Sequence, residues 1–505
     1  MRRWMYVAIV SSVLLLLFLG FKVLRFQALY YVFNDMYIFL QASCSWMDGR
    51  PLLYENIWGY DDRIHNNYGL ILWGPLIYVW GAYGAFIVQT ALYTVSYTLL
   101  IRQLSNGLPG WLSWTMLFTV LLGPVWFWFN EHPGIGWHPE LTYLPLSILF
   151  ILALDSRQKG WVVLTGALIV LVKEDGALLA GSIHLAYVCL QYLKNNPHTS
   201  IFSVLTHPRF WVTLVSWAVL FVAGMLFLSY KNHAVEPEPR LQQALNAITT
   251  GLHQTEFVRI HAALLGHVVL LILPSFLLLL YLLWRFEVRQ IGSIVLVYMV
   301  AQIGILMSNW VQGATYYGSN PFFHLVSLTW PPRFVLTYAF SVCYILAAVF
   351  VFKRAMRPVA SWQPTALASG LFLIQLLIVP YARPDFTWSA ELRDTFAHRF
   401  DPQKQPMLPD NDVAIIEQLA QTIPARSNVF VFDYLIPLFH KHYNIWPTEK
   451  QWEKADLAII PNNDFQKLGE RMPRVMKQPL RSRRLETYTL FFSPAYEPYV
   501  NAILK

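Results

Sequence analysis

The sequence predicts a polytopic α-helical membrane protein, and three observations support this fold class. Hydrophobic residues make up 56% and charged residues 13% of the 505 residues, so the charged share is about half that of a typical soluble domain. Apolar runs long enough to cross a bilayer recur along the chain. Many Trp and Tyr residues lie at the ends of these runs, as in the aromatic belts of membrane proteins.

The apolar runs predict about eleven membrane spans. The first run is longer than the core of a signal peptide and ends in Lys22 and Arg25, which indicates an uncleaved span. The spans are expected near residues 5–24, 83–101, 111–129, 141–154, 161–172, 176–193, 210–229, 262–284, 290–309, 333–352 and 363–381. The fourth and fifth runs are shorter than a bilayer is thick.

The charge distribution predicts the orientation of these spans, because Lys and Arg are enriched in cytoplasmic loops. Alternate connections carry the basic residues Arg2, Arg3, Arg102, Arg157, Lys159, Lys194, Arg209, Arg285, Arg289, Lys353, Arg354 and Arg357. The opposite connections carry many acids, although Lys22, Arg25, Lys231 and Arg240 would lie on that side too. We therefore expect a multi-pass protein of the plasma (inner) membrane with a cytoplasmic N-terminus.

An odd number of spans places the C-terminal part outside the cytoplasm. There "NDVAIIEQLAQTI" has helical periodicity, "SNVFVFD" and "ADLAIIP" indicate short buried strands, and "RRLETYTLFF" indicates another strand. The expected domains are therefore a transmembrane domain at 1–381, with a first external loop at 26–67, and an extracytoplasmic α/β cap at 382–505.

Composition also excludes several functions. The net charge of +8 is not gathered into a basic stripe, so we expect no nucleic-acid partner. Cys44, Cys189 and Cys343 are far apart and form no CxxC pair, so the sequence indicates neither a disulfide framework nor a cysteine-based zinc site.

Asp35 opens the first of three polar segments on the predicted outer face. It begins "DMYIFLQASCSWM", whose apolar residues have helical spacing, so we expect a helix lying along the membrane interface. Asp35 is either a reactive acid or an ordinary helix-start acid favoured by the helix dipole.

The second segment, "NEHPGIGWHPELTYLPL", places Glu131, His132, His138 and Glu140 between two spans. Imidazoles and carboxylates are zinc ligands, but the segment has no HExxH helix or other standard ligand spacing. A turn with incidental polar residues, broken by its Pro and Gly residues, is the alternative. No cofactor is firmly implied, and a divalent metal lacks a supporting motif.

The third segment, "LIVLVKEDGALLAG", interrupts an apolar stretch with Lys173, Glu174 and Asp175. The triplet is either a tight outer turn between two spans or a charged group within the membrane, which would mark a functional site. A solvated turn with an internal ion pair is the plainer interpretation. Because all three segments lie on one face, the sequence predicts an acid-rich cavity there with one cation.

Several of these motifs resemble a known group of proteins. "NDMYIFLQASCSWMDGRPLL", "HNNYGLILWGPLIYVWGAYGAFIVQTALY", "WHPELTYLPLSILFILAL", "LVKEDGAL" and "IPARSNVFVF...ADLAIIP" resemble an uncharacterised family of predicted bacterial and archaeal multi-pass membrane proteins. That family is similar to GT-C glycosyltransferases, which include protein O-mannosyltransferases and lipid A aminoarabinose transferases. The resemblance implies that Asp35 matches their first-loop acid, Glu140 their second acid and Lys173 the lysine of their "LTKG" turn.

The resemblance implies a membrane glycosyltransferase that uses a polyprenyl-phosphate sugar and an extracytoplasmic glycan, lipid or protein acceptor, with membrane lipids around it. Asp35 is the expected catalytic base and Glu140 the second catalytic acid. The expected substrate-binding residues are His65, His138, Lys173, Glu174, Asp175 and Arg333, of which Lys173 and Arg333 would neutralise the phosphate. Direct displacement would invert the anomeric centre.

Two other functions remain open. A transporter or flippase of a lipid-linked or amphipathic substrate could use the same intramembrane charges, although the sequence has no internal repeat of the kind common in transporters. A receptor or assembly scaffold would instead use the external domain as its working part. Sugar release from a lipid-phosphate donor distinguishes the enzyme from both.

Overall fold

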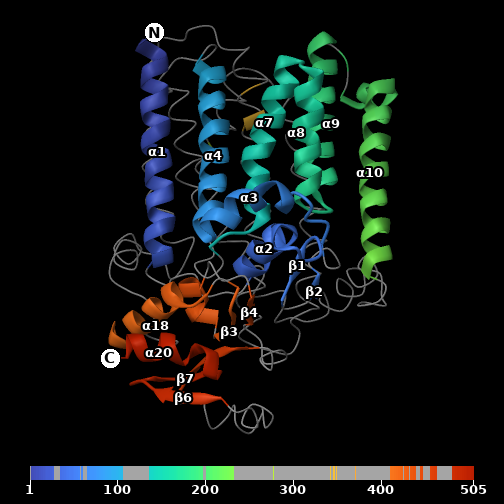
Figure 1. Cartoon of the computed structure of the whole chain (residues 1–505). Helices are drawn as coiled ribbons and strands as arrows, with labels where there is room; N and C mark the ends of the chain where they lie inside the picture. The colour runs from blue at the N-terminus through green and yellow to red at the C-terminus, as the bar shows by residue number, and fades with distance from the viewer. Residues whose placement is uncertain are drawn as a thin grey trace, which may run out of the picture.

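The computed structural model describes residues 2–27, 35–56, 59–60, 65–105, 136–196, 199, 201–232, 410–424, 426–431, 433–439, 444–446, 455–462 and 480–504, with the isolated positions 277, 342, 345, 346, 349 and 370. In this part of the chain, a row of long helices carries a small α/β domain at one end (Figure 1). The N-terminus lies at the opposite end of the helices from this domain (Figure 1).

The long helices pack side by side in an order close to that of the sequence. α1 packs against α4, α4 against α7, α7 against α8 and α9, and α9 against α10. Their bounds are α1 (Arg2–Gln27), α4 (Ala82–Ser105), α7 (Tyr143–Ser156), α8 (Lys159–Val172), α9 (Gly176–Asn195) and α10 (Pro208–Asn232). The short 3₁₀ helix η5 (Ile201–Thr206) precedes α10.

Four helical segments of the described residues are long and apolar enough to cross a membrane, namely Ala82–Leu104, Pro139–Ser156, Gly176–Asn195 and Pro208–Lys231. The protein is therefore a membrane protein with a mostly helical fold. The total of about eleven spans stays a prediction, because the expected spans at 111–129, 262–284, 290–309, 333–352 and 363–381 lie outside the described residues or reach them only at isolated positions.

The two shortest predicted spans are both helices. The run at 141–154 forms α7, which the 3₁₀ turn η4 (Pro139–Thr142) precedes. The run at 161–172 forms α8, an apolar helix of 14 residues that is shorter than the four candidate spans. Lys173, Glu174 and Asp175 separate α8 from α9, so the tight-turn interpretation of this triplet is correct.

The segment predicted to be the first external loop forms compact elements beneath the long helices (Figure 1). α2 (Asp35–Cys44) leads into η1 (Ser45–Asp48), the short strands β1 (Tyr54–Glu55) and β2 (Gly59–Tyr60) pair antiparallel, and α3 (Leu70–Trp80) follows. Residues 36–44 of α2 are all buried. The predicted helix is confirmed, and α3 and the C-terminal domain cover it, whereas its place along the membrane interface stays a prediction.

Gly74 accounts for the close contact between α2 and α3. A Cβ atom at this position would lie 2.3 Å from the carbonyl oxygen of Ser43. No side chain larger than hydrogen fits there without moving one helix, so this glycine allows α3 to cover α2 directly.

The C-terminal domain is a five-stranded mixed sheet with helices beside it. The strand order is β4-β3-β5-β7-β6, with β3 parallel to β4 and β5, and β7 antiparallel to β5 and β6. The strands are β3 (Asn428–Val431), β4 (Asn444–Trp446), β5 (Leu457–Pro461), β6 (Arg481–Arg484) and β7 (Tyr488–Phe492). The helical elements are α18 (Asp410–Thr422), η7 (Asp433–Phe439), η10 (Pro494–Tyr496) and α20 (Glu497–Ile503).

One strand prediction in this domain differs from the structure. "RRLETYTLFF" was expected to form one strand, but it contains the end of β6, a turn and all of β7. The Asp412 carboxylate accepts hydrogen bonds from the backbone nitrogen atoms of Glu486 at 3.3 Å and Thr487 at 2.7 Å. This contact from α18 holds the turn, and no local pattern in the segment reveals it.

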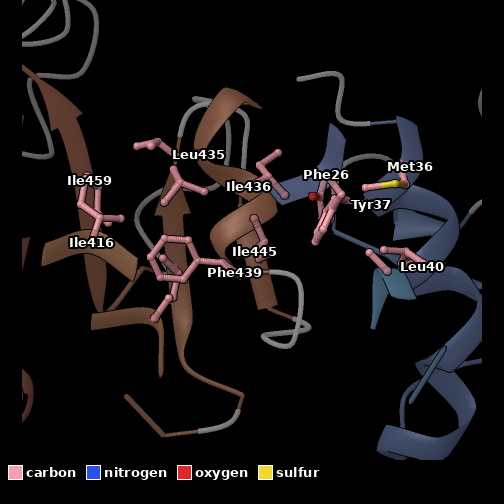
Figure 2. Close-up of a cluster of buried hydrophobic side chains, with 14 of the residues drawn as sticks. Phe26, Met36, Tyr37, Leu40, Ile416, Leu435, Ile436, Phe439, Ile445 and Ile459 are labelled. Atoms are coloured by element: carbon pink, nitrogen blue, oxygen red, sulfur yellow. The ribbon is translucent and has the colours of Figure 1, made fainter. Parts of the chain in front are cut away.

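A continuous apolar core joins the C-terminal domain to the first external loop and to α1. Figure 2 shows Ile436 and Ile445 of the C-terminal domain facing Phe26 and Tyr37. All four side chains are buried. The C-terminal domain therefore packs directly on α2, the helix that begins at Asp35.

Candidate active site

The turn between α8 and α9 is the centre of the candidate site. α8 ends at Val172, Lys173 is extended, and α9 begins at Gly176. The backbone nitrogen of Gly176 donates to the carbonyl of Lys173 at 3.0 Å and closes the turn. A Cβ atom on Gly176 would lie 2.1 Å from the carbonyl oxygen of Ile169, so only glycine allows α9 to begin this close to the end of α8.

Glu140 brings a cation and an imidazole together. Its Oε1 atom lies 2.9 Å from Lys173 Nζ, and its Oε2 atom contacts Nδ1 of His138. The Glu140 side chain is 7% exposed, whereas the Lys173 side chain is 21% exposed. A buried carboxylate needs such partners, and Lys173 lies at the edge of the cluster.

Glu174 links the turn to the first external loop. His65 Nδ1 lies 2.9 Å from Glu174 Oε1, and the backbone nitrogen of Asn66 donates to Oε2 at 3.1 Å. Burial alone would raise the pKa of Glu174, but the charges of His65 and Lys173, with these hydrogen bonds, lower it well below the usual range. Glu174 is therefore an ionised anchor for the loop.

Asp175 has a separate partner. The hydroxyl of Tyr143, the first residue of α7, donates to its Oδ1 atom. Asp175 also precedes the first residue of α9 but makes no side-chain capping bond there. Its carboxylate thus connects α7 to α9 across the turn.

Asp35 is the first residue of α2, and its side chain lies outside the described part of the structure. One helical turn later, the Phe39 ring lies edge-on to the His138 ring, with 4.5 Å between ring centroids. Residues four apart lie on the same face of a helix. The start of α2 is therefore one turn from the residue that contacts His138.

The structure brings together most of the residues that the sequence singles out. His138, Glu140 and Lys173 form one cluster, His65 and Glu174 form a second, and both meet at the α8–α9 turn. Arg333, and also Glu131 and His132 of the second segment, lie outside the described residues. In the described ranges, no group of three or more His, Cys, Asp and Glu residues is arranged to hold a metal ion.

Two residues of this region were missed by sequence reasoning. Tyr143 follows Glu140 by three residues and was not singled out, yet it binds Asp175. Lys22 was taken as an exception to the charge rule, yet it is buried and donates to the carbonyl of Gly136, close to His138. The expectation of one cation at the site was therefore incomplete. Lys22 and Arg25 are both buried, which explains why they do not follow a rule for loop residues.

Comparison with solved structures shows a similarity of fold. No family model matches the chain, and no curated protein sequence matches it. The structure is similar to the crystal structure of ArnT from Cupriavidus metallidurans bound to undecaprenyl phosphate, with a TM-score of 0.46, 12% sequence identity, and coverage of 94% of this chain and 97% of that chain.

Because the sequence identity and the TM-score are low, no residue role is carried over from that structure to this chain. The roles proposed below therefore rest on the contacts described above.

Proposed function

We propose that the protein is a membrane glycosyltransferase that moves a sugar from a polyprenyl-phosphate donor to an acceptor on the face that bears the C-terminal domain. The observation that carries this proposal is the meeting of α2, η4 and the α8–α9 turn. These elements bring the start of α2 close to a buried carboxylate, an imidazole and a partly exposed lysine. A base and a phosphate-binding cation are the two groups that such a transfer needs.

Lys173 is the proposed phosphate ligand. An ammonium group has three N–H donors, and the described contact of Lys173 with Glu140 uses one of them. The remaining donors can bind the phosphate oxygens and stabilise the charge that develops as the lipid phosphate leaves. Glu140 holds the lysine in place, and His138 holds Glu140.

Asp35 is the proposed base. It accepts the proton of the acceptor hydroxyl as the acceptor oxygen bonds to the anomeric carbon and the bond from that carbon to the phosphate oxygen breaks. Because phosphate is a good leaving group, this single displacement needs no strong general acid. It inverts the anomeric centre.

The test is product formation in proteoliposomes. Purified protein is reconstituted with a panel of synthetic polyprenyl-phosphate sugars and candidate acceptors, and free polyprenyl phosphate is measured by mass spectrometry. We expect release of the lipid phosphate that depends on Lys173. Movement of intact donor between leaflets without bond cleavage would instead establish a flippase.

A further inference from the structure

Arg426 holds an unusual backbone conformation at the contact between the C-terminal domain and the first external loop. It lies between α18 and β3 and has φ 71°, in the left-handed region that non-glycine residues rarely adopt. Its carbonyl accepts a hydrogen bond from Asn444 Nδ2 at 2.8 Å. Strained positions of this kind persist where the surrounding contacts require them.

The side chain of Arg426 reaches the first external loop. Its Nη2 atom lies 3.2 Å from Oδ1 of Asp48, the last residue of η1. The other carboxylate oxygen of Asp48 lies 3.2 Å from Nη2 of Arg50. The Asp48 side chain is 5% exposed and the Arg426 side chain 58% exposed. The cation of the C-terminal domain thus binds a buried carboxylate whose position is already fixed by Arg50.

Arg426 also contacts α3. Its guanidinium donates to the Tyr78 hydroxyl, and this hydrogen bond, with the charge of Asp48, raises the pKa of Arg426. One side chain of the C-terminal domain therefore touches both η1, which continues from α2, and α3, which covers α2.

A second contact lies beside the first. The carbonyl of Ile445, in the edge strand β4, accepts from Asn56 Nδ2 at 3.0 Å and from Gln41 Nε2 at 3.4 Å. The backbone nitrogen of Asn56 in turn donates to Gln41 Oε1 at 2.9 Å. Gln41 lies in the middle of α2, so the edge of the sheet is covered by α2 itself.

We propose that Arg426 is a positioning residue that keeps α2 closed against α3 and against His138, and thereby sets the place of Asp35. The closure of α2 by Arg426 is independent of catalysis. The effect of that closure on Asp35 rests on the proposed glycosyltransferase function. A shift of η1 moves the end of α2 because the two elements are continuous in the chain.

Cys44 provides a native reporter of this closure. It is fully buried at the end of α2, and its thiol faces the carbonyl of Gly74 in α3, with 3.5 Å between the sulfur and oxygen atoms. Burial raises the pKa of this thiol, so the closed form reacts slowly with maleimides. Opening of α2 from α3 exposes the thiol and speeds the reaction.

The experiment is N-ethylmaleimide labelling of the reconstituted full chain in a Cys189→Ser, Cys343→Ser background. Arg426→Gly removes the side chain, and glycine suits the left-handed turn better than arginine does, so the domain keeps its fold. We expect the labelling rate of Cys44 to rise at least tenfold. Arg426→Lys keeps the cation and should label at nearly the wild-type rate.

Arg483→Ala is the matched control, because Arg483 is an exposed arginine of the same domain on β6. It should leave the labelling rate unchanged. An unchanged rate in Arg426→Gly, or an equal rise in Arg483→Ala, would overturn the proposal for α2.

The consequence for catalysis has its own readout. We expect Arg426→Gly to lower kcat at least tenfold while the KM for the lipid donor stays the same, and Arg426→Lys to restore kcat. A normal kcat together with fast labelling would overturn the link to Asp35. Absence of turnover in the wild type would instead contradict the proposed function, while the labelling result still decides the role of Arg426.

Discussion

Lys173 follows directly on the apolar helix α8, and its ammonium group lies 2.9 Å from Glu140 Oε1. A lysine in a solvated turn would pair with its own neighbours, Glu174 and Asp175. Here those two acids bind His65 and Tyr143 instead. Lys173 is thus paired with Glu140 of another element, although its charge also lowers the pKa of Glu174.

Lys173→Ala should weaken binding of the lipid donor by roughly 10–100-fold, since a hydrogen bond to a charged group contributes about 1.5–3 kcal/mol. Donor affinity is measured by titration in nanodiscs, with thermal unfolding of the same samples as the control for folding. Lys173→Arg should recover part of the affinity, because it keeps the charge with a different geometry. A lower unfolding temperature with normal donor affinity would show that Lys173 is only a structural residue.

Asp35→Asn should lower the rate of transfer by roughly 10²–10⁴-fold, because it removes the general base but keeps the shape of the side chain. Asparagine is also a good helix-capping residue, so the start of α2 should stay intact. The measurement is the initial rate in proteoliposomes that bind donor normally. If Asp35 is merely a helix-start acid, turnover will be nearly normal, and Glu140 becomes the next candidate for the base.

Sequence reasoning identified most residues of the site but not their partners. His138, Glu140, Lys173 and Glu174 were singled out because polar groups between apolar runs are costly in a membrane protein. His65 was singled out by the family resemblance. Their pairing depends on how the first loop folds back on the α8–α9 turn, which local patterns do not encode. For the same reason Lys22 was taken for a loop residue, although it is buried.

At the scale of elements, the α8–α9 turn should make the stability of the protein sensitive to acid. The pKa of Glu174 is lowered by the folded structure, whereas an unperturbed glutamate has a pKa of about 4.3. Its contribution to stability is therefore complete above about pH 4.3 and is lost as the pH falls below that value. The unfolding temperature of the wild type should drop across this range.

Glu174→Gln should flatten this dependence, since glutamine does not titrate. Unfolding temperatures are compared in detergent between pH 7 and pH 3, with Glu417→Gln, a change to an exposed acid of α18, as the control. Equal acid sensitivity in the wild type and in Glu174→Gln would rule out the Glu174 contact as its source.

The predicted elements differ in how well their sequences encode them. Long apolar runs predicted the bounds of α1, α4, α9 and α10 to within a few residues, because the length of an apolar run indicates the length of a membrane helix. The turn between β6 and β7 was missed, because Asp412 holds it from α18, more than 70 residues away in the sequence. The burial of α2 was missed as well, since its cover comes from β4 and α3.

At the scale of the whole molecule, the helices place the N-terminus and the C-terminal domain at opposite ends (Figure 1). With the positive-inside distribution of Lys and Arg, this predicts a cytoplasmic N-terminus and an extracytoplasmic C-terminal domain. Alkaline phosphatase fused after residue 400 should be active, and the same reporter fused after Lys194 should be inactive. An active fusion after Lys194 with an inactive fusion after residue 400 would reverse the proposed face of the site.

The central claim is that the protein transfers a sugar from a lipid phosphate in one displacement step. The measurement that tests it most directly is the nuclear magnetic resonance spectrum of the product formed by purified protein from a polyprenyl-phosphate sugar of known anomeric configuration. The account predicts a glycosylated acceptor of inverted configuration and one free polyprenyl phosphate for each sugar transferred. A product of retained configuration, or recovery of all the donor intact, would contradict it.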